Sequence, residues 1–211
     1  LVNKITEHAW KNGEPGIVFI DEINRDNPTP WLGDIQATNP CGEQPLLSYE
    51  ACNLGSINLS KMVVDGKLDE DKLRGTVRSA VDFLDSVIDT SVYPLEEIGS
   101  MVRFTRKIGL GVMGFADMLA LTGIPYDSNE AVIMAENLSF KISAYAEGMS
   151  LELGEARGEC PALKMKEEDG RKPMRNATLT TIAPTGTISM IANCSSGCEP
   201  LFGVVYKKSN V

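Results

Sequence analysis

The hydrophobic pattern in the first part of the chain predicts a helix, a strand and a long loop, in that order. Apolar residues between positions 1 and 10 are spaced as on one helical face, and we expect this helix to end near Gly13. The apolar run of residues 17–20 predicts a short buried strand of the kind found in parallel sheets. Residues 21–44 are polar and rich in Pro, Asn and Asp, which predicts a long loop. Long loops inside compact domains are usually functional, so this segment is the first place to seek a site.

The middle of the chain has the pattern of strands and turns followed by helices. Residues 46–59 have strand and turn character, and Asp65-Gly66 predicts a further turn. Residues 110–121 predict a helix. Before it, an amphipathic helix is predicted because apolar residues recur mostly at three- and four-residue steps, at Leu68, Leu73, Val77, Val81, Leu84 and Ile88.

The last third of the chain returns from helix to strand. Ser128 is the expected N-cap of a helix whose apolar stripe runs from Ala131 to Leu153. Residues 158–175 predict a loop, residues 177–182 a strand, and residues 183–187 a turn that leads into a short helix. This order of strand, helices, strand and helix predicts an α/β fold with helices outside a buried sheet.

Composition places the chain among ordinary globular proteins. It has 211 residues, of which 43% are apolar and 23% charged, enough for one sizeable core. No apolar stretch approaches the about 20 residues that span a bilayer, and no basic segment followed by an apolar one opens the chain, so we expect a cytoplasmic protein without membrane contact. The net charge of -9 argues against nucleic acid as a partner.

The two ends of the sequence suggest a piece of a longer polypeptide. The chain starts at Leu1 without Met and stops just after the strand-like run of residues 202–206. We therefore expect residues 1–211 to be a single partial domain, truncated at both termini.

The five cysteines favour free or redox-active thiols over a structural disulfide framework. Their number is odd, and no secretory signal is present. A zinc site is poorly supplied, because His8 is the one histidine and no C-x-x-C spacing occurs, so we expect no metal ligands. Cys194 and Cys198 are four residues apart, which permits a redox or metal role, but we interpret them, and Cys160, as small buried thiols.

The run Asn39-Pro40-Cys41-Gly42-Glu43 concentrates chemistry inside the predicted loop. In an extended or turning backbone, Asn39 and Glu43 can point the same way as Cys41, two residues from each. A thiol can give or take a hydrogen atom, a carboxylate can act as a general base, and an amide can bind a hydroxyl. Spacing alone leaves an ordinary loop cysteine as the simpler interpretation.

A second constellation is the turn Pro184-Thr185-Gly186-Thr187-Ile188. A glycine-containing turn between a strand and a helix presents backbone N–H groups that can bind an anion, and the two threonines add hydroxyls. Without further context, an ordinary strand-to-helix turn explains the same residues.

Gly109, Gly111 and Gly114 form a literal G-x-G-x-x-G and raise the alternative of a nicotinamide-dependent dehydrogenase. That fingerprint requires a preceding apolar strand and an acidic residue about 20 positions later. Residues 103–107 are largely polar, so we expect the glycines to permit close helix packing instead.

Over nearly its whole length the chain resembles the ribonucleotide reductases, most closely the adenosylcobalamin-dependent class II. Class I enzymes, which use a separate radical-generating subunit, share the core residues and are the alternative to class II. The resemblance rests on four segments, which occur in the family's order: residues 21–30 (DEINRDNPTP), 37–59 (the Cys41 loop through CNLGSINL), 108–117 (IGLGVMGFAD) and 183–189 (APTGTIS).

The resemblance implies a role for each residue of the Cys41 loop. Cys41 matches the thiyl-radical cysteine that takes the hydrogen atom from C3′ of a ribonucleotide. Glu43 matches the base that accepts the 3′-hydroxyl proton, and Asn39 matches the amide that hydrogen-bonds the substrate. Cys52 matches one member of the redox-active cysteine pair, with its partner expected upstream of Leu1.

The resemblance also implies a substrate site, a fold and partners. Residues 39–43 and 184–188 would contact the ribonucleotide, the latter at its phosphates, with diphosphates as the expected substrates and triphosphates as the alternative. The fold would be part of a ten-stranded α/β barrel around the radical-bearing loop. Adenosylcobalamin is the implied cofactor, a thioredoxin-like dithiol the implied reductant, and a homodimer the implied assembly of the complete protein. The alternative is a non-catalytic piece of a split reductase.

Overall fold

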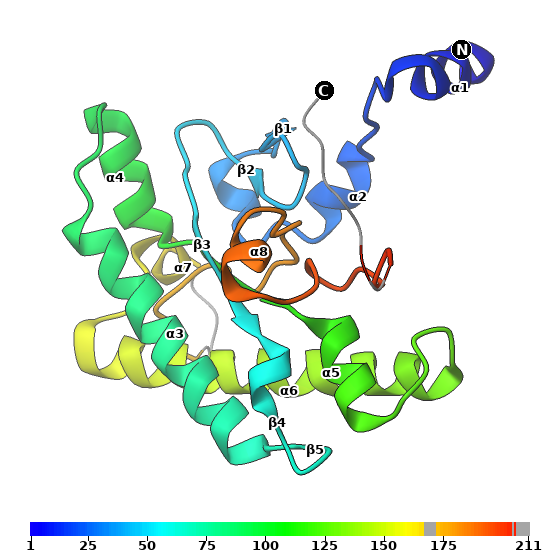
Figure 1. The fold of residues 1–211 in the computed structure, drawn as a ribbon. Helices are drawn as coiled ribbons and strands as arrows, with labels where there is room; N and C mark the ends of the chain where they lie inside the picture. Colours follow the sequence, from blue (N-terminus) through cyan, green and yellow to red (C-terminus); the bar gives the residue numbers. More distant parts are fainter. Residues whose placement is uncertain (167–171, 204, 206–211) are drawn as a thin grey trace. The chain divides into compact units, whose positions relative to one another are not determined.

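The computed structural model describes residues 1–166, 172–203 and 205 (Figure 1). The chain forms two compact units, Leu1–Ser48 and Tyr49–Val211. The two units are described one after the other. Part of the strand-like run at 202–206, and part of the loop predicted at 158–175, lie outside the described residues.

The first unit consists of short elements. These are α1 (Val2–Asn12), α2 (Ile20–Arg25), the 3-10 helix η1 (Pro30–Leu32), β1 (Ala37–Thr38) and β2 (Pro45–Leu46). The predicted first helix is confirmed, and it ends at Gly13, whose φ of 78° is the left-handed conformation that glycine adopts without strain. The prediction of one uninterrupted loop over residues 21–44 is wrong, because α2, η1 and β1 lie within it.

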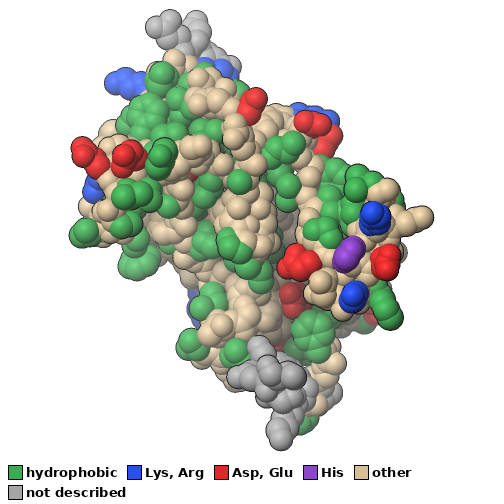
Figure 2. Space-filling model, turned by 90° about the horizontal axis from the view of Figure 1, so that it is seen from above, with side chains coloured by type: hydrophobic (Ala, Val, Ile, Leu, Met, Phe, Trp, Pro, Cys, Tyr) green, Lys and Arg blue, Asp and Glu red, His purple; other side chains and the backbone are tan. Residues whose placement is uncertain are grey.

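The predicted buried strand at residues 17–20 is also wrong. Ile17, Val18 and Phe19 are 59%, 51% and 73% exposed, and Ile20 begins α2. A run of four apolar residues does not distinguish a strand from other structures, since a strand also needs a partner. Here Asp21 and Glu22 occupy the first turn of α2, where carboxylates stabilise a helix N-terminus. On the face seen in Figure 2, apolar side chains lie at the surface among polar and charged ones.

The second unit carries the main core. Its elements are β3 (Asn53–Asn58), the 3-10 helix η2 (Leu59–Met62), β4 (Val63–Val64), β5 (Lys67–Leu68), α3 (Glu70–Thr90), α4 (Glu96–Thr105), β6 (Ile108–Met113), α5 (Phe115–Thr122), α6 (Asn129–Arg157), α7 (Pro161–Lys164) and α8 (Ile188–Ala192). The predicted turn at Asp65-Gly66 is confirmed, and it joins β4 to β5.

Strand β6 is the centre of a parallel arrangement. It pairs with β3 over six positions, from Asn53 opposite Ile108 to Asn58 opposite Met113. On its other edge, Leu110 N–H donates to Leu179 O at 2.8 Å, and Thr181 N–H donates to Leu110 O at 3.1 Å. The predicted strand at 177–182 is therefore present as a short parallel bridge to Leu110.

The prediction of a helix over residues 110–121 is half wrong. Residues up to Met113 belong to β6, and the helix α5 begins only at Phe115. All six residues of β6 are buried, so both faces are apolar and the alternation that marks a half-exposed strand is missing. Gly114, with a φ of 72°, makes the turn from strand to helix. Helix α4, which was not predicted from the sequence, precedes β6.

Helices α3 and α6 were correctly predicted and pack against the strands. In Figure 1 the two helices cross each other beside β3. Asp69 caps α3 by accepting the Lys72 N–H at 2.9 Å, and Ser128 caps α6 by accepting the Ala131 N–H at 3.1 Å. Such caps each contribute about 1 kcal/mol. The core joins apolar side chains of both helices to those of β3 and β6.

A buried charge cluster fixes the start of the segment of residues 177–182, which pairs with β6. Asp85 on α3 is fully buried and accepts hydrogen bonds from Arg106 Nη2 at 2.7 Å, Arg175 Nε at 3.3 Å and Asn176 Nδ2 at 3.0 Å. Arg106 also binds Asp89, and this hydrogen bonding lowers the pKa of the Asp89 carboxyl below its ordinary value. The cluster links α3, the end of α4 and the segment that leads to Thr181.

The architecture is the predicted α/β one, with parallel strands covered by helices, and the described residues do not close into a barrel. Over the residues described, no helix is both long and apolar enough to cross a bilayer.

We predict that two glycines of α6 respond oppositely to alanine. A Cβ at Gly154 would lie 1.7 Å from Pro173 O, so Gly154→Ala should destabilise the protein by several kcal/mol, on the order of an overpacked core substitution. A Cβ at Gly148 meets nothing within 4 Å, and Gly148→Ala should be neutral or add up to about 1 kcal/mol through helix propensity. Urea unfolding of both variants measures the difference, and equal stabilities would contradict this packing.

Candidate active site

Residues 39–44 form the loop of a small hairpin in the first unit. Strands β1 and β2 pair antiparallel on either side of it. The Asn39 N–H donates to Gln44 O at 3.1 Å, and the Gln44 N–H donates to Asn39 Oδ1 at 3.0 Å. These two hydrogen bonds close the base of the loop. Gln44 is buried and was not singled out from the sequence.

The tip of this hairpin is a β-turn that presents Cys41. The Gly42 N–H donates to Asn39 O at 3.0 Å, which places Pro40 and Cys41 at the two central positions. Proline suits the first of these positions because its φ is already fixed. Gly42 has a φ of 86°, which glycine adopts readily. The Cys41 side chain is exposed and that of Glu43 is partly buried.

The geometry defines what each side chain of the loop can offer a ligand. Because Asn39 Oδ1 already accepts the Gln44 N–H, the amide can turn its Nδ2 donors toward a ligand. Cys41 offers a thiol at the surface, and Glu43 offers a carboxylate two residues later. One short loop therefore carries a hydrogen-bond donor, a thiol and a carboxylate.

Cys52 lies in the second unit, one residue before β3. It is partly buried, and its Sγ is 3.5 Å from Asn53 O. The two residues before Cys52 include Glu50, whose Oε2 forms a buried ion pair with Lys107 Nζ at 2.7 Å, and Lys107 directly precedes β6. The Cys52 thiol thus lies at the start of β3, and the nearby ion pair was not predicted from the sequence.

The turn of residues 184–188 also lies in the second unit, and its last residue, Ile188, begins α8. Thr185 is buried and has a φ of 53°, an uncommon conformation for a residue with a side chain. Its Oγ1 accepts the Gly197 N–H at 2.7 Å, and its carbonyl accepts the Ser189 N–H at 2.9 Å. The Thr185 side chain therefore shapes the turn from within.

The outer part of this turn is open to a ligand. Gly186, Thr187 and Ile188 are exposed. Within the described part of the chain, the backbone N–H groups of Gly186 and Thr187 donate to no protein acceptor. Adjacent backbone N–H groups in a turn that have no protein acceptor can bind an anion such as a phosphate.

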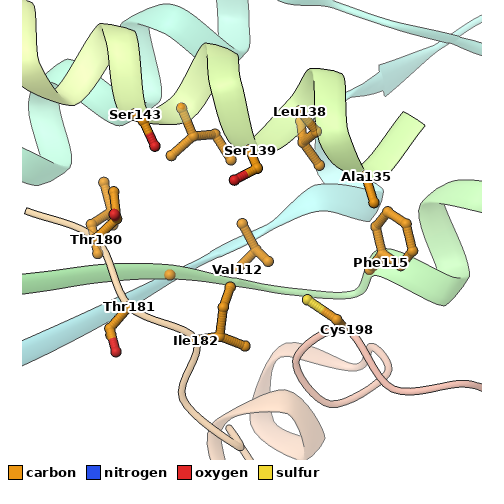
Figure 3. Close-up of a pocket in the computed structure, with 13 residues that line it drawn as sticks. Val112, Phe115, Ala135, Leu138, Ser139, Ser143, Thr180, Thr181, Ile182 and Cys198 are labelled. Atoms are coloured by element: carbon orange, nitrogen blue, oxygen red, sulfur yellow. The ribbon is translucent and has the colours of Figure 1, made fainter. Parts of the chain in front are cut away.

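A cavity of about 350 Å³ lies between α6, β6 and the segment of residues 180–182 (Figure 3). Ser139 and Ser143 contribute hydroxyls from α6, Cys198 contributes a thiol, and the other lining is mainly apolar. No charged side chain lines the cavity, so it is unsuited to the phosphates of a nucleotide.

Of the three other cysteines, Cys160 is buried as predicted, whereas the prediction is wrong for Cys194 and Cys198, which are only partly buried. Burial raises the pKa of the Cys198 thiol above its ordinary value. Burial, and next the negative charge of Asp117, raise the pKa of Cys194. Cys160 is completely buried, its Sγ lies 3.2 Å from Thr105 O, and burial raises its pKa as well. A high pKa disfavours the reactive thiolate.

The glycine motif at 109–114 does not form a dinucleotide-binding turn. Gly109 and Gly111 lie inside β6 itself, rather than in the turn after a strand. The expected role in helix packing is wrong too, because Gly111 allows close contact between β6 and the carbonyl of Thr181. Among the residues described, no three His, Cys, Asp or Glu side chains come together as a metal site.

We predict that alkylating reagents separate the thiols by position. At pH 8, iodoacetamide should modify the exposed Cys41 first and leave Cys160 unmodified in the folded protein, because Cys160 is buried and its pKa is raised. Peptide mass spectrometry measures the order, with protein in denaturant as the control. Equal labelling of both residues before unfolding would contradict the structure.

Comparison with known proteins places this arrangement in a family. The sequence matches the family described as "Ribonucleotide reductase, barrel domain" over residues 1–169 and 162–211. The "Vitamin B12-dependent ribonucleoside-diphosphate reductase" of Thermoplasma acidophilum is 57% identical over 205 residues, which are 96% of this chain and 27% of that protein. The protein of the same name from Mycobacterium tuberculosis is 52% identical over 211 residues, which are 100% of this chain and 30% of that protein.

A solved structure agrees. The "Actinobacillus ureae class Id ribonucleotide reductase alpha subunit" is similar to 93% of this chain with a TM-score of 0.78 and 27% identity, and the similarity covers 38% of that subunit. The chain thus spans less than a third of the length of the two curated relatives. On the match over its whole length, the chain belongs to the ribonucleotide reductase family, as part of its barrel domain.

Proposed function

We propose that the protein containing this chain reduces ribonucleoside diphosphates to deoxyribonucleoside diphosphates by a thiyl-radical mechanism. One observation carries the proposal. The thiol of Cys41 is exposed at the corner of a hairpin loop, between Asn39 and Glu43, in a chain whose relatives are named ribonucleoside-diphosphate reductases.

In this proposal the Cys41 loop acts on the ribose. Cys41, as a thiyl radical, takes the hydrogen atom from C3′ and returns it after reduction. Glu43 accepts the proton of the 3′-hydroxyl. Asn39 donates from Nδ2 to a substrate oxygen, because its Oδ1 is held by the Gln44 N–H. Pro40 and Gly42 keep the turn in the shape that presents Cys41.

The reducing electrons come from a cysteine pair that includes Cys52. Removal of the 2′-hydroxyl as water requires two electrons and two protons. Cys52 and a second cysteine of the complete protein each give up one electron and one proton, and their sulfur atoms join as a disulfide. An external thioredoxin-like dithiol then reduces this disulfide by thiol exchange.

The substrate's phosphates are proposed to bind the turn of residues 184–188. Gly186 and Thr187 are exposed, and their N–H groups donate to no acceptor within the described residues, which supports this role; the Thr187 hydroxyl can add a donor. Pro184 and Ile188 bound the turn, and the buried Thr185 maintains its conformation. The remaining affinity for the nucleotide would come from the rest of the protein.

Adenosylcobalamin is the proposed cofactor, as the names of the two relatives indicate. The residues present fit this requirement, because a large cofactor could reach the exposed thiol of Cys41. When bound, the cofactor would supply the radical equivalent that takes the hydrogen atom from this thiol. We further propose a cytoplasmic homodimer in which the two units are parts of one barrel domain, without nucleic acid or membrane as partners.

We predict that Cys41→Ser in the complete protein abolishes deoxyribonucleotide formation, because a hydroxyl cannot replace the thiol in hydrogen-atom transfer. Chromatographic assay of the deoxyribonucleotide product measures turnover. The matched control is Cys198→Ser, which should retain activity, since this thiol lies beside the apolar cavity. Turnover retained by Cys41→Ser would disprove the proposal.

We predict that Glu43→Gln slows turnover by about 10²- to 10⁴-fold, the usual contribution of a general base. Glutamine keeps the size and polarity of the side chain, so nucleotide affinity should stay within a few-fold. Steady-state kinetics combined with equilibrium binding of the nucleotide separates the two effects. A large loss of affinity with unchanged turnover would contradict a role as base.

A further inference from the structure

The segment Gly111–Asp117 has no part in the proposed chemistry, yet it contacts the residues around the 184–188 turn at three points. The first contact is between strands. A Cβ at Gly111 would lie 2.5 Å from Thr181 O, so only glycine allows the segment of residues 177–182 to approach β6 this closely. Thr181 lies three residues before Pro184, and its position therefore sets where the turn begins.

The second contact is made by Gly114 at the end of β6. Its N–H donates to Ser195 O at 2.7 Å. A Cβ at Gly114 would lie 2.7 Å from Asn58 Oδ1 and 3.2 Å from the Cβ of Cys194. The chain after α8 thus packs directly on the backbone at Gly114.

The third contact is made by the carboxylate of Asp117 in the first turn of α5. Asp117 Oδ2 accepts the Ser195 N–H at 2.5 Å. A hydrogen bond to a charged acceptor is about twice as strong as a neutral one. The pKa of Cys194, raised mainly by burial and then by the charge of Asp117, agrees with this proximity.

The loop that Asp117 holds also holds the turn. Beyond Ser195, the Gly197 N–H donates to Thr185 Oγ1 at 2.7 Å, and the hydroxyls of Ser196 and Ser189 are 3.0 Å apart. Thr185 has a φ of 53°, a conformation that persists only when neighbouring contacts determine it. Asp117 and Thr185 are thus connected through three consecutive residues, Ser195 to Gly197.

We propose that Asp117 is a positioning residue for the phosphates of the substrate. Its carboxylate fixes residues 195–197, these fix Thr185, and Thr185 sets the direction of the Gly186 and Thr187 N–H groups. The inference rests on the proposed function of the 184–188 turn. It assigns a part in phosphate binding to Asp117, which precedes its hydrogen-bond partner Ser195 by 78 residues.

The test compares Asp117→Ala, Asp117→Asn and the wild type in the complete protein. Each is assayed for kcat and KM with a ribonucleoside diphosphate, and for the binding of that diphosphate and of the nucleoside without phosphates. The matched control is Glu130→Ala, which also removes a first-turn carboxylate, here an exposed one on α6.

We expect Asp117→Ala to raise KM for the diphosphate about tenfold, in line with loss of one hydrogen bond to a charged acceptor, while kcat changes less than about twofold. Nucleoside binding should not change. Asp117→Asn keeps an oxygen acceptor and should recover most of the affinity, and Glu130→Ala should behave as wild type.

Equal losses for diphosphate and nucleoside, a loss confined to kcat, or no loss at all would overturn the positioning role. If Asp117→Ala does not fold, Thr185→Val removes the next link in the same chain of contacts, and it must show the same selective loss of phosphate affinity. Turnover by the wild type tests the proposed function separately. If the wild type is active and the Asp117 variants have unchanged KM and diphosphate affinity, this inference alone is refuted.

Discussion

The second unit depends on one constraint, which is that β6 is hydrogen-bonded along both edges. One edge pairs with β3 over six positions, and the other binds the segment that contains Thr181. All six residues of β6 are buried, and apolar side chains of helices α3 and α6 belong to the core that covers the faces of the strand. The two glycines inside β6 leave it little side-chain volume. That allows the backbone of Thr181 to come close, and the place of the 184–188 turn follows from this contact.

The proposed reaction divides its tasks between two kinds of loop. The proposed radical thiol, that of Cys41, belongs to a hairpin whose tip is exposed and whose base is closed by the Asn39 side chain. The turn proposed to bind the phosphates is instead fixed from inside, by Thr185 and by a loop anchored at Asp117. An exposed thiol suits a residue that must meet both substrate and cofactor. A rigid array of N–H groups suits a charged group that only has to be held.

The sequence predicted best where the signals are local. Helices α3 and α6 have long apolar stripes and side-chain caps at Asp69 and Ser128, so propensity and packing agree. The Cys41 loop was singled out through its spacing and the family resemblance, and its role in the reaction stays a prediction. The strand predicted at 17–20 failed because four apolar residues contain no information about a partner. Strand β6 was taken for a helix because burial on both faces erases alternation, and Asp117 was missed because Ser195 lies 78 residues away.

The most direct test of the central claim is a crystal structure of the complete protein with a bound ribonucleoside diphosphate. We expect C3′ of the ribose to face the Cys41 thiol, with Glu43 at the 3′-hydroxyl and the phosphates on the N–H groups of Gly186 and Thr187. A nucleotide bound away from the Cys41 loop, or one with its base rather than its ribose at Cys41, would contradict the assignment of this loop as the reaction centre.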